Sequence, residues 1–155
     1  MIRQEIISSP IGFLMVVSQD ECLVEIELVN CFEKLTDENP SIFSVQLNEY
    51  FAGQRKHFDF AYLLPPTPFA RDIMSALSQI PFGELISYGQ LARAAGYSTG
   101  AARAVGSVMR TNPIPIVLPC HRVICADGTW GQYSLGGAEC KHWLIEFESR
   151  NGQTS

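Results

Sequence analysis

The stretch NPIPIVLPCHRVI, residues 112–124, holds the residues whose types and spacing are best suited to chemistry. Its three prolines forbid a continuous helix and stiffen an apolar segment that ends at Cys120. A cysteine held at a fixed position can be a nucleophile, and its reactive form is the thiolate. His121 and Arg122 follow directly, and a neighbouring imidazole or guanidinium favours that form. Cys120 is therefore the candidate nucleophile.

His121 is the candidate base, and its imidazole needs a third group to orient it. Neighbouring side chains on an extended backbone point to opposite faces, so we expect His121 to act on the Cys120 sulfur through a turn or a bridging water. A carboxylate on a partly apolar helix stripe also needs a partner, and His121 is the candidate for Glu148. The closing segment CKHWLIEFE predicts such a stripe, formed by Lys141, Leu144, Ile145 and Glu148.

Simpler interpretations of these patterns stay open. A cysteine beside a histidine is more often structural than catalytic. The alternative for Glu148, nearly as compatible with the pattern, is a solvent-exposed carboxylate near the end of the helix. The residues around the Cys-His pair, rather than the pair itself, distinguish the catalytic interpretation from the structural one.

A pair of short helices is predicted ahead of the cysteine. The segment SYGQLARAAGYSTGAARAVGSVMR divides at Gly96 into two helical parts, which is the layout of a helix-turn-helix. Residues 100–107 are nearly all small, so this face can approach another surface closely while the long side chain of Arg103 projects from it. A tightly packed helix pair is the alternative, because Ala and Gly also permit close helix contact.

The remaining patterns predict two domains. Short β-rich segments, GFLMVVS and CLVEIELV, predict a hairpin, and LNEYFAGQ predicts a short helix that ends at Gly53. The proline-rich LLPPTP is the candidate linker, so we expect a small β-rich domain over residues 1–65 and a second domain over residues 66–155. The second domain begins with a helix capped at Thr67, whose apolar positions are Phe69, Ile73, Leu77 and Ile80.

Charge is distributed unevenly over these two domains. The net charge of −5 divides into −6 over residues 1–65 and +1 over residues 66–155. Between Glu84 and Asp127 the sequence has no carboxylate, which is typical of a phosphate-facing surface. A chance gap among ordinary surface arginines is the alternative. The arginines of this stretch are Arg93, Arg103, Arg110 and Arg122.

Composition limits the remaining classes of protein. The 155 residues are 46% hydrophobic, which is enough for one good core or two small ones. The amino-terminus has only a short apolar run before Asp20 and Glu21, so we expect neither a signal peptide nor a membrane span, and a cytoplasmic location. Five cysteines without a CxxC pair argue against a disulfide framework and a thiolate zinc site.

With these residues in view, the chain resembles the O6-alkylguanine-DNA alkyltransferases, also called methylated-DNA–protein-cysteine methyltransferases. The resemblance covers PFGELISYGQLARAAG, GAARAVGSVMRTNPIPIVLPCHRVI and the glycine-rich loop leading to KHWLIEFE. It implies an α+β fold, in which a small β-rich domain precedes a helical domain with a winged helix-turn-helix. It also implies a monomer that binds the minor groove of double-stranded DNA and needs no metal or organic cofactor.

The resemblance implies a role for each matching residue. Cys120 would accept the alkyl group of O6-alkylguanine, with O4-alkylthymine as a second candidate substrate, irreversibly and once. It would be activated through water by His121, which Glu148 holds. Tyr88 would donate a proton to the purine, and Arg103 would replace the flipped base on a helix whose small residues, among them Ala102, approach the DNA. The DNA surface would include Arg110, and the base pocket would include Val123, Tyr133, Ser134, the hinge residue Asn112 and the loop lysine Lys141.

One departure and three rival functions accompany this resemblance. Leu135 follows Ser134 as an extra residue before Gly136 and Gly137, so the pocket loop differs from the usual pattern. A lesion-binding module would carry tryptophan in place of Cys120. A transcriptional regulator would need sequence-specific base contacts, and a cysteine hydrolase would turn over repeatedly.

Overall fold

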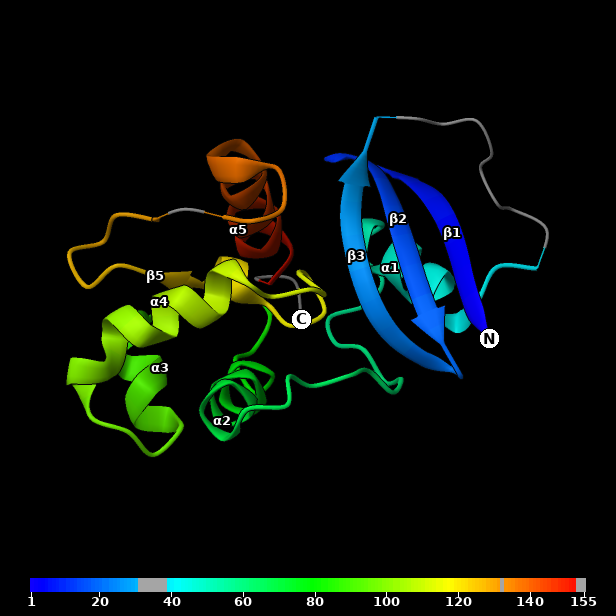
Figure 1. Ribbon diagram of the computed structural model, residues 1–155. Helices are drawn as coiled ribbons and strands as arrows, with labels where there is room; N and C mark the ends of the chain where they lie inside the picture. Colours follow the sequence, from blue (N-terminus) through cyan, green and yellow to red (C-terminus); the bar gives the residue numbers. More distant parts are fainter. Residues whose placement is uncertain (31–38, 132, 153–155) are drawn as a thin grey trace. The chain divides into compact units, whose positions relative to one another are not determined.

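The computed structural model describes residues 1–30, 39–131 and 133–152 (Figure 1). The chain divides into two compact units, Met1–Leu63 and Leu64–Ser155, which we call the sheet unit and the helical unit. Among the described residues, no helix has the length and apolar character needed to cross a membrane.

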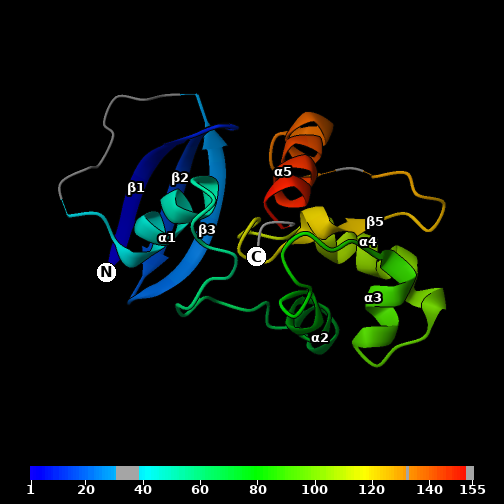
Figure 2. The ribbon, with the colours of Figure 1, turned by 180° about the vertical axis from the view of Figure 1, so that it is seen from behind.

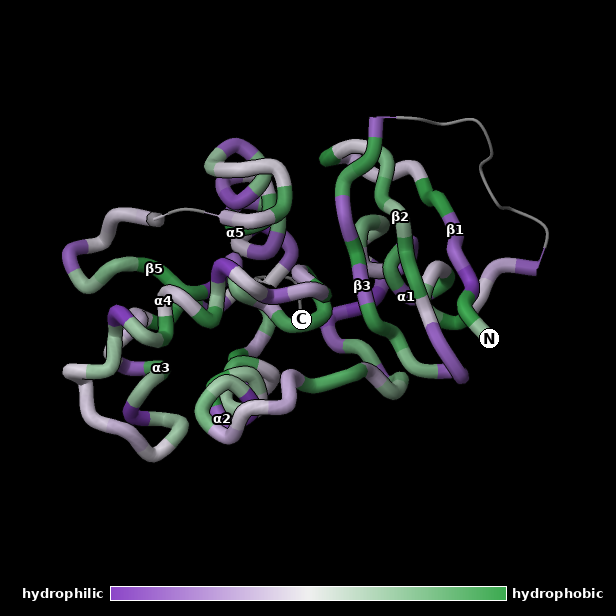
Figure 3. The backbone as a smooth tube through the Cα atoms, viewed as in Figure 1, coloured by the Kyte–Doolittle hydropathy of each residue, from purple (hydrophilic) through white to green (hydrophobic). Residues whose placement is uncertain are grey.

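The sheet unit is built on three antiparallel strands, in the order β1 (Ile2–Ser9), β2 (Gly12–Gln19) and β3 (Cys22–Val29). Asp20 and Glu21 form the turn between β2 and β3 with positive φ angles of 52° and 65°, as tight hairpins require. The predicted hairpin is therefore confirmed. The sequence analysis missed β1, because its polar residues weaken the alternating pattern, whereas most of β2 is hydrophobic (Figure 3).

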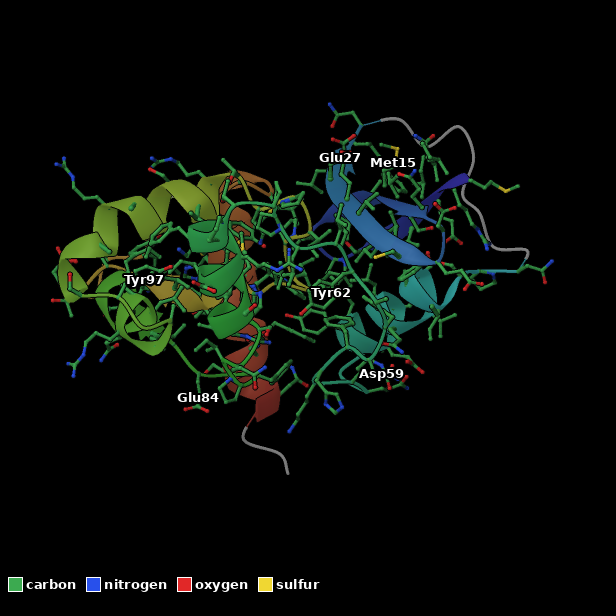
Figure 4. All side chains as sticks on the ribbon, turned by 60° about the horizontal axis from the view of Figure 1, so that its bottom comes forward. Met15, Glu27, Asp59, Tyr62, Glu84 and Tyr97 are labelled. Atoms are coloured by element: carbon green, nitrogen blue, oxygen red, sulfur yellow. The ribbon has the colours of Figure 1, made fainter. Side chains whose placement is uncertain are left out.

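One face of this sheet carries the core of the unit. Leu14 and Val16 are buried on that face, while Met15 and Glu27 are register partners on the other (Figure 4). Helix α1 (Ile42–Phe51) lies against the sheet (Figure 2). The sequence analysis predicted this helix to begin five residues later, and the cause of the difference is an N-cap at Ser41, whose Oγ accepts a hydrogen bond from the Ser44 N–H at 3.3 Å.

The helical unit combines helices of seven to sixteen residues with 3-10 turns and two-residue strands. Its two strands, β4 and β5, pair in parallel. In chain order the elements are α2 (Pro68–Leu77), β4 (Ile86–Ser87), α3 (Tyr88–Ala94), the 3-10 turn η1 (Thr99–Ala101), α4 (Ala102–Arg110), the 3-10 turn η2 (Cys120–Arg122), β5 (Val123–Ile124) and α5 (Gly137–Gly152).

Helix α2 begins at the predicted position but is shorter than predicted. Thr67 occupies the N-cap and Pro68 the first turn. The helix ends at Leu77, and the Ile80 N–H then bonds to the Leu77 carbonyl at 3.0 Å in a tighter turn. This turn continues the apolar spacing beyond the helix, which explains the overprediction.

Helices α3 and α4 form the predicted pair. Ser87 and Gln90 make a reciprocal capping box at the start of α3, and Gly96, with φ at 93°, lies in the turn that follows the helix. Tyr97 ties this turn to α2, because its hydroxyl donates to Asp72 at 2.7 Å (Figure 4). The pair buries Leu91, Ala92, Val105 and Met109.

Helix α5 presents its buried stripe with one change from the prediction. Lys141, Leu144 and Glu148 are buried as expected, but Phe147 takes the place predicted for Ile145, which is half-buried. Phe147 stacks on Trp143 with ring centroids 4.9 Å apart. Stacking favours burial of the aromatic ring at this position.

Candidate active site

Cys120 lies at the start of η2, directly after the apolar segment 113–119. The Cys120 side chain is only 4% exposed. The sequence analysis assumed an extended backbone here, and this was wrong: Cys120–Arg122 form a single 3-10 turn, closed by the Arg122 N–H and the Pro119 carbonyl at 2.9 Å. Ile116, buried within the segment, has φ at 77°, a strained angle for a β-branched residue.

Asn112 connects the two ends of this segment. Its Nδ2 donates to the Leu118 carbonyl at 2.8 Å and to the Cys120 sulfur at 3.2 Å. Its Oδ1 accepts from the Ile114 N–H at 3.1 Å. One buried amide therefore holds both the loop and the thiol in place, a contact that sequence patterns did not reveal.

The structure brings His121 and Glu148 together across 27 residues of sequence. His121 Nε2 lies 2.7 Å from Glu148 Oε2, and both side chains are buried. An ionised carboxylate can only accept, so Nε2 carries the hydrogen in this bond. Among the described residues, Nδ1 of His121 has no hydrogen-bond partner. The imidazole therefore presents a bare, buried nitrogen.

Arg122 is also a partner of Glu148, which the sequence analysis did not expect. Its Nε and Nη2 donate to the two carboxylate oxygens at 2.8 Å and 2.9 Å. Its Nη1 donates to the Ile80 carbonyl at 2.6 Å, and the Gly83 N–H adds a further bond to Glu148 Oε1 at 3.2 Å. The guanidinium was predicted to favour the Cys120 thiolate; instead its hydrogen bonds go to Glu148 and Ile80.

Burial dominates the protonation of these groups. It raises the pKa of Cys120 to about 11, although the Asn112 hydrogen bond and the Lys141 charge oppose it. Burial also lowers the pKa of His121, against the pull of Glu148. For Glu148, burial would raise the pKa, but His121 and Arg122 together hold it well below its usual range. At neutral pH the site thus contains a thiol, a neutral imidazole and a carboxylate, whereas the sequence analysis expected its neighbours to favour the thiolate.

Lys141 supports the loop that follows the cysteine. The side chain is buried on α5, and its Nζ donates to the Val123 carbonyl at 2.7 Å and to the Trp130 carbonyl. Burial lowers the pKa of Lys141, while Cys120 and Cys125 favour its charged form. Val123 was expected to line the base pocket, and its carbonyl accepts from Lys141 here.

The residues of the pocket loop differ in how far they are buried. Tyr133 is buried, with its ring perpendicular to that of His121 at 6.4 Å between centroids. Ser134 is exposed, and the extra residue Leu135 is only 4% exposed. The side chain of Leu135 therefore belongs to the interior of the unit, which its hydrophobicity alone could have indicated.

A cleft of about 790 Å³ lies over α3 and α4, and no carboxylate is among the described residues that line it. Four residues predicted to meet DNA, namely Tyr88, Ala102, Arg103 and Arg110, line it together with Arg93 and Cys125. Cys120 does not line the cleft, but it is close enough to Tyr88 to affect it. Burial raises the pKa of Tyr88, and negative charge on Cys125 and Cys120 acts in the same direction. The cationic surface and the buried thiol are thus neighbours, and Tyr88 is close to both.

Metal coordination finds no support in the described ranges. Within residues 1–30, 39–131 and 133–152, no cluster of three or more His, Cys, Asp or Glu residues could hold a metal ion. Cys31 lies outside these ranges.

Comparison with known proteins gives one consistent result. Residues 2–64 match the ribonuclease-like domain of 6-O-methylguanine DNA methyltransferase, and residues 68–150 match the DNA binding domain of the same protein. A methylated-DNA–protein-cysteine methyltransferase of Mycolicibacterium paratuberculosis is 40% identical over 162 residues, covering 100% of this chain and 97% of the relative.

Solved structures agree with the sequence comparison. The O6-methylguanine methyltransferase of Mycobacterium tuberculosis superimposes with a TM-score of 0.85 at 36% identity, covering 100% of this chain and 97% of that one. The same organism's protein in complex with DNA gives 0.84 at 37% identity, covering 96% and 93%. The matched ranges include nearly all of the chain and every residue of the site described above. The chain therefore belongs to the 6-O-methylguanine DNA methyltransferase family.

Proposed function

We propose that this protein is a methylated-DNA–protein-cysteine methyltransferase, which repairs DNA by moving an alkyl group from O6-alkylguanine to the sulfur of its own Cys120. The observation that carries this function is the buried Cys120–His121–Glu148 arrangement: a protonated thiol is followed in the chain by an imidazole that is bonded to Glu148 through Nε2 and has no partner on Nδ1 among the described residues. Relatives carry the name of this enzyme, and one solved relative is bound to DNA.

The transfer begins with removal of the thiol proton. The bare Nδ1 of His121 accepts it through a bridging water, and Glu148 stabilises the imidazolium that forms. The sulfur then forms a bond to the alkyl carbon while the bond from that carbon to O6 breaks, and guanine leaves with the electron pair. Tyr88 donates a proton to N3 of the departing purine. The thioether is stable, so each molecule reacts once.

The base has to leave the DNA stack to reach this thiol. Cys120 is nearly inaccessible and does not line the cleft, so a base within a duplex lies too far from the sulfur. We assign Arg103, exposed on α4, to the vacancy that a flipped nucleotide leaves. Val123, Tyr133, Ser134, Asn112 and Lys141 then surround the flipped base, and O4-alkylthymine is a second candidate substrate.

The DNA contacts follow from the cleft. Arg93, Arg103 and Arg110 supply positive charge beside small residues, which allow close approach to a minor groove. In this proposal residues 66–155 bind DNA as a winged helix-turn-helix and accept the alkyl group, residues 1–65 form a separate small domain, and the protein acts as a monomer.

Intact-protein mass spectrometry tests this function. The protein is incubated with an excess of duplex containing a single O6-methylguanine, and we expect its mass to rise by one methyl group and no more, with the methyl group on Cys120 after proteolysis. Cys120→Ser is the control that should remain unmodified, and Cys125→Ser and Cys140→Ser should react like the wild type. Binding of the alkylated duplex without a mass change would identify a lesion-binding module, and repeated turnover would identify a hydrolase.

Arg103 provides a test of base flipping. Arg103→Ala should slow transfer from duplex DNA far more than transfer from free O6-benzylguanine, because only the duplex needs its flipped base replaced. Single-turnover rates on both substrates measure this difference. Arg93→Ala is the control for lost cleft charge, since it removes a cleft arginine that is not on α4, and it should slow duplex transfer less than Arg103→Ala does. Equal losses on both substrates for Arg103→Ala would remove this role.

A further inference from the structure

We propose that Arg122 is a positioning residue for alkyl transfer, which fixes the Glu148 carboxylate and through it the hydrogen-bonding state of His121. The inference rests on the proposed function, because it concerns the same reaction. It assigns Arg122 a task that differs from any direct action on the thiol.

Arg122 is held at one nitrogen by Ile80 and binds Glu148 through the other two, an arrangement that we call the clamp. Its Nη1 is anchored on the Ile80 carbonyl at 2.6 Å, while Nε and Nη2 contact the two Glu148 oxygens at 2.8 Å and 2.9 Å. The guanidinium is planar and presents these donors in a rigid fork, so a bidentate pair sets the plane of the carboxylate as well as its position. The clamp therefore joins the turn after α2 to α5.

This clamp determines which oxygen faces the imidazole. Glu148 Oε1 accepts from Arg122 Nε and from the Gly83 N–H, and Oε2 accepts from Arg122 Nη2 and from His121 Nε2. Four donors hold the two oxygens, so the carboxylate cannot rotate without losing bonds in a buried setting. With Nε2 occupied as a donor, the bare lone pair of the imidazole stays on Nδ1.

Electrostatics adds a second effect of the same side chain. The charged groups that act on His121 are Glu148, Arg122 and Lys141; the carboxylate favours an imidazolium and the two cations oppose it. The pKa of His121 lies below its ordinary value of 6.5, chiefly through burial, and Arg122 contributes to the lowering. Burial chiefly keeps His121 neutral before the reaction, and the charge of Arg122 acts in the same direction, so that the base can accept a proton.

A purely structural ion pair is the competing explanation, and a pH profile separates the two. Loss of a structural pair lowers the amount of folded protein and scales the transfer rate equally at every pH. Loss of the proposed clamp removes a positive charge beside His121, so the pKa of His121 rises. The neutral base is then lost at a higher pH as the solution is acidified.

The experiment compares Arg122→Met and Arg122→Lys with the wild type in single-turnover transfer from an O6-methylguanine duplex. For Arg122→Met we expect the acid limb of the rate profile to move to higher pH, with about a tenfold greater loss between about pH 8 and about pH 5.5 than in the wild type, since one pKa unit corresponds to tenfold in protonation. Arg122→Lys keeps the charge without the fork, so its acid limb should stay in place while the rate falls throughout. Uniform scaling for Arg122→Met, or a wild-type rate for Arg122→Lys, would overturn the inference.

Two further measurements keep the test decisive. In a Glu148→Gln background, Arg122→Lys should cause no further loss of rate, because the effect of the fork is transmitted through Glu148. The NMR titration of the His121 ring should show the higher pKa in Arg122→Met even if the wild type transfers no alkyl group. An inactive wild type would contradict the proposed function alone, whereas an unmoved His121 titration would contradict the role of Arg122.

Discussion

Glu5 in the sheet unit and Glu148 in the helical unit are equally buried, each with an exposed fraction of 1%, yet their surroundings differ. Glu5 accepts bonds from the backbone N–H of Ser41 at 3.0 Å, from the Ser41 hydroxyl, and from Arg3 at 3.3 Å. These partners join strand β1 to the start of helix α1. These donors are a backbone amide, a hydroxyl and a guanidinium, and none of them is an imidazole.

Glu148 has the same need for donors but one partner of another kind. His121 can take up and release a proton near neutral pH, and its second nitrogen is bare among the described residues. Both carboxylates satisfy the rule that buried charge must be paired. The comparison teaches that burial of a carboxylate marks a structural requirement, while a titratable partner beside a nucleophile marks a site of chemistry.

The largest expected difference between the two glutamates is in the transfer rate. Glu148→Gln should slow single-turnover transfer about a hundredfold, because an amide stabilises an imidazolium poorly and general-base assistance is worth at least about this factor. Glu5→Gln should transfer at the wild-type rate when scored per folded molecule. A wild-type rate for Glu148→Gln over the whole pH range would reduce it to a second structural carboxylate.

A smaller difference is expected in the reactivity of the resting thiol without DNA. Below the Cys120 pKa of about 11 the thiolate fraction rises about tenfold per pH unit, so iodoacetamide should modify Cys120 faster as the pH increases. Glu148→Gln should raise this pKa further and slow the modification several-fold at a given pH, since His121 then accepts a proton less well. Peptide mass spectrometry follows Cys120 separately. Glu5→Gln serves as the control, and the comparison breaks if both variants change the rate alike.

The smallest expected effect concerns stability alone. Ser41→Ala removes the side-chain cap of α1 and one bond to Glu5, and should lower the free energy of unfolding by about 1 kcal/mol. Urea denaturation measures this loss, and transfer from alkylated duplex should be unchanged. Ser87→Ala removes the corresponding cap of α3, beside Tyr88, and should affect both stability and transfer. A transfer defect in Ser41→Ala would mean that the Glu5 region also serves the reaction.

Local patterns predicted those parts of the molecule that local forces determine. The β2–β3 hairpin, the start of α2 and the division of α3 from α4 at Gly96 all follow from alternation, capping and glycine within a few residues. The start of α1 was misplaced because its apolar spacing is weak and its beginning is set by Ser41 and the distant Glu5.

The site was only partly predictable for the same reason. The apolar stripe of the last helix indicated Glu148, and the position next to Cys120 indicated His121, so their pairing could be proposed from the sequence. The bidentate contact of Arg122, its anchor at Ile80 and the amide of Asn112 on the sulfur depend on how separate segments pack. Such contacts leave no periodic signal, and the backbone turn at Cys120 was misjudged because proline indicates stiffness without specifying direction.

The burial of Cys120 has a consequence for the life of the protein in a cell. A molecule that the proposed reaction consumes after one event cannot be regenerated, so alkylation of Cys120 by a soluble metabolite, or its oxidation beyond the sulfenic acid, would remove repair capacity permanently. A thiol with 4% exposure that stays protonated at neutral pH is a poor target for such small molecules. In the proposed reaction, burial of Cys120 therefore limits alkylation to a base that is brought to the thiol, so the amount of active protein should fall with the number of lesions in DNA rather than with general chemical stress.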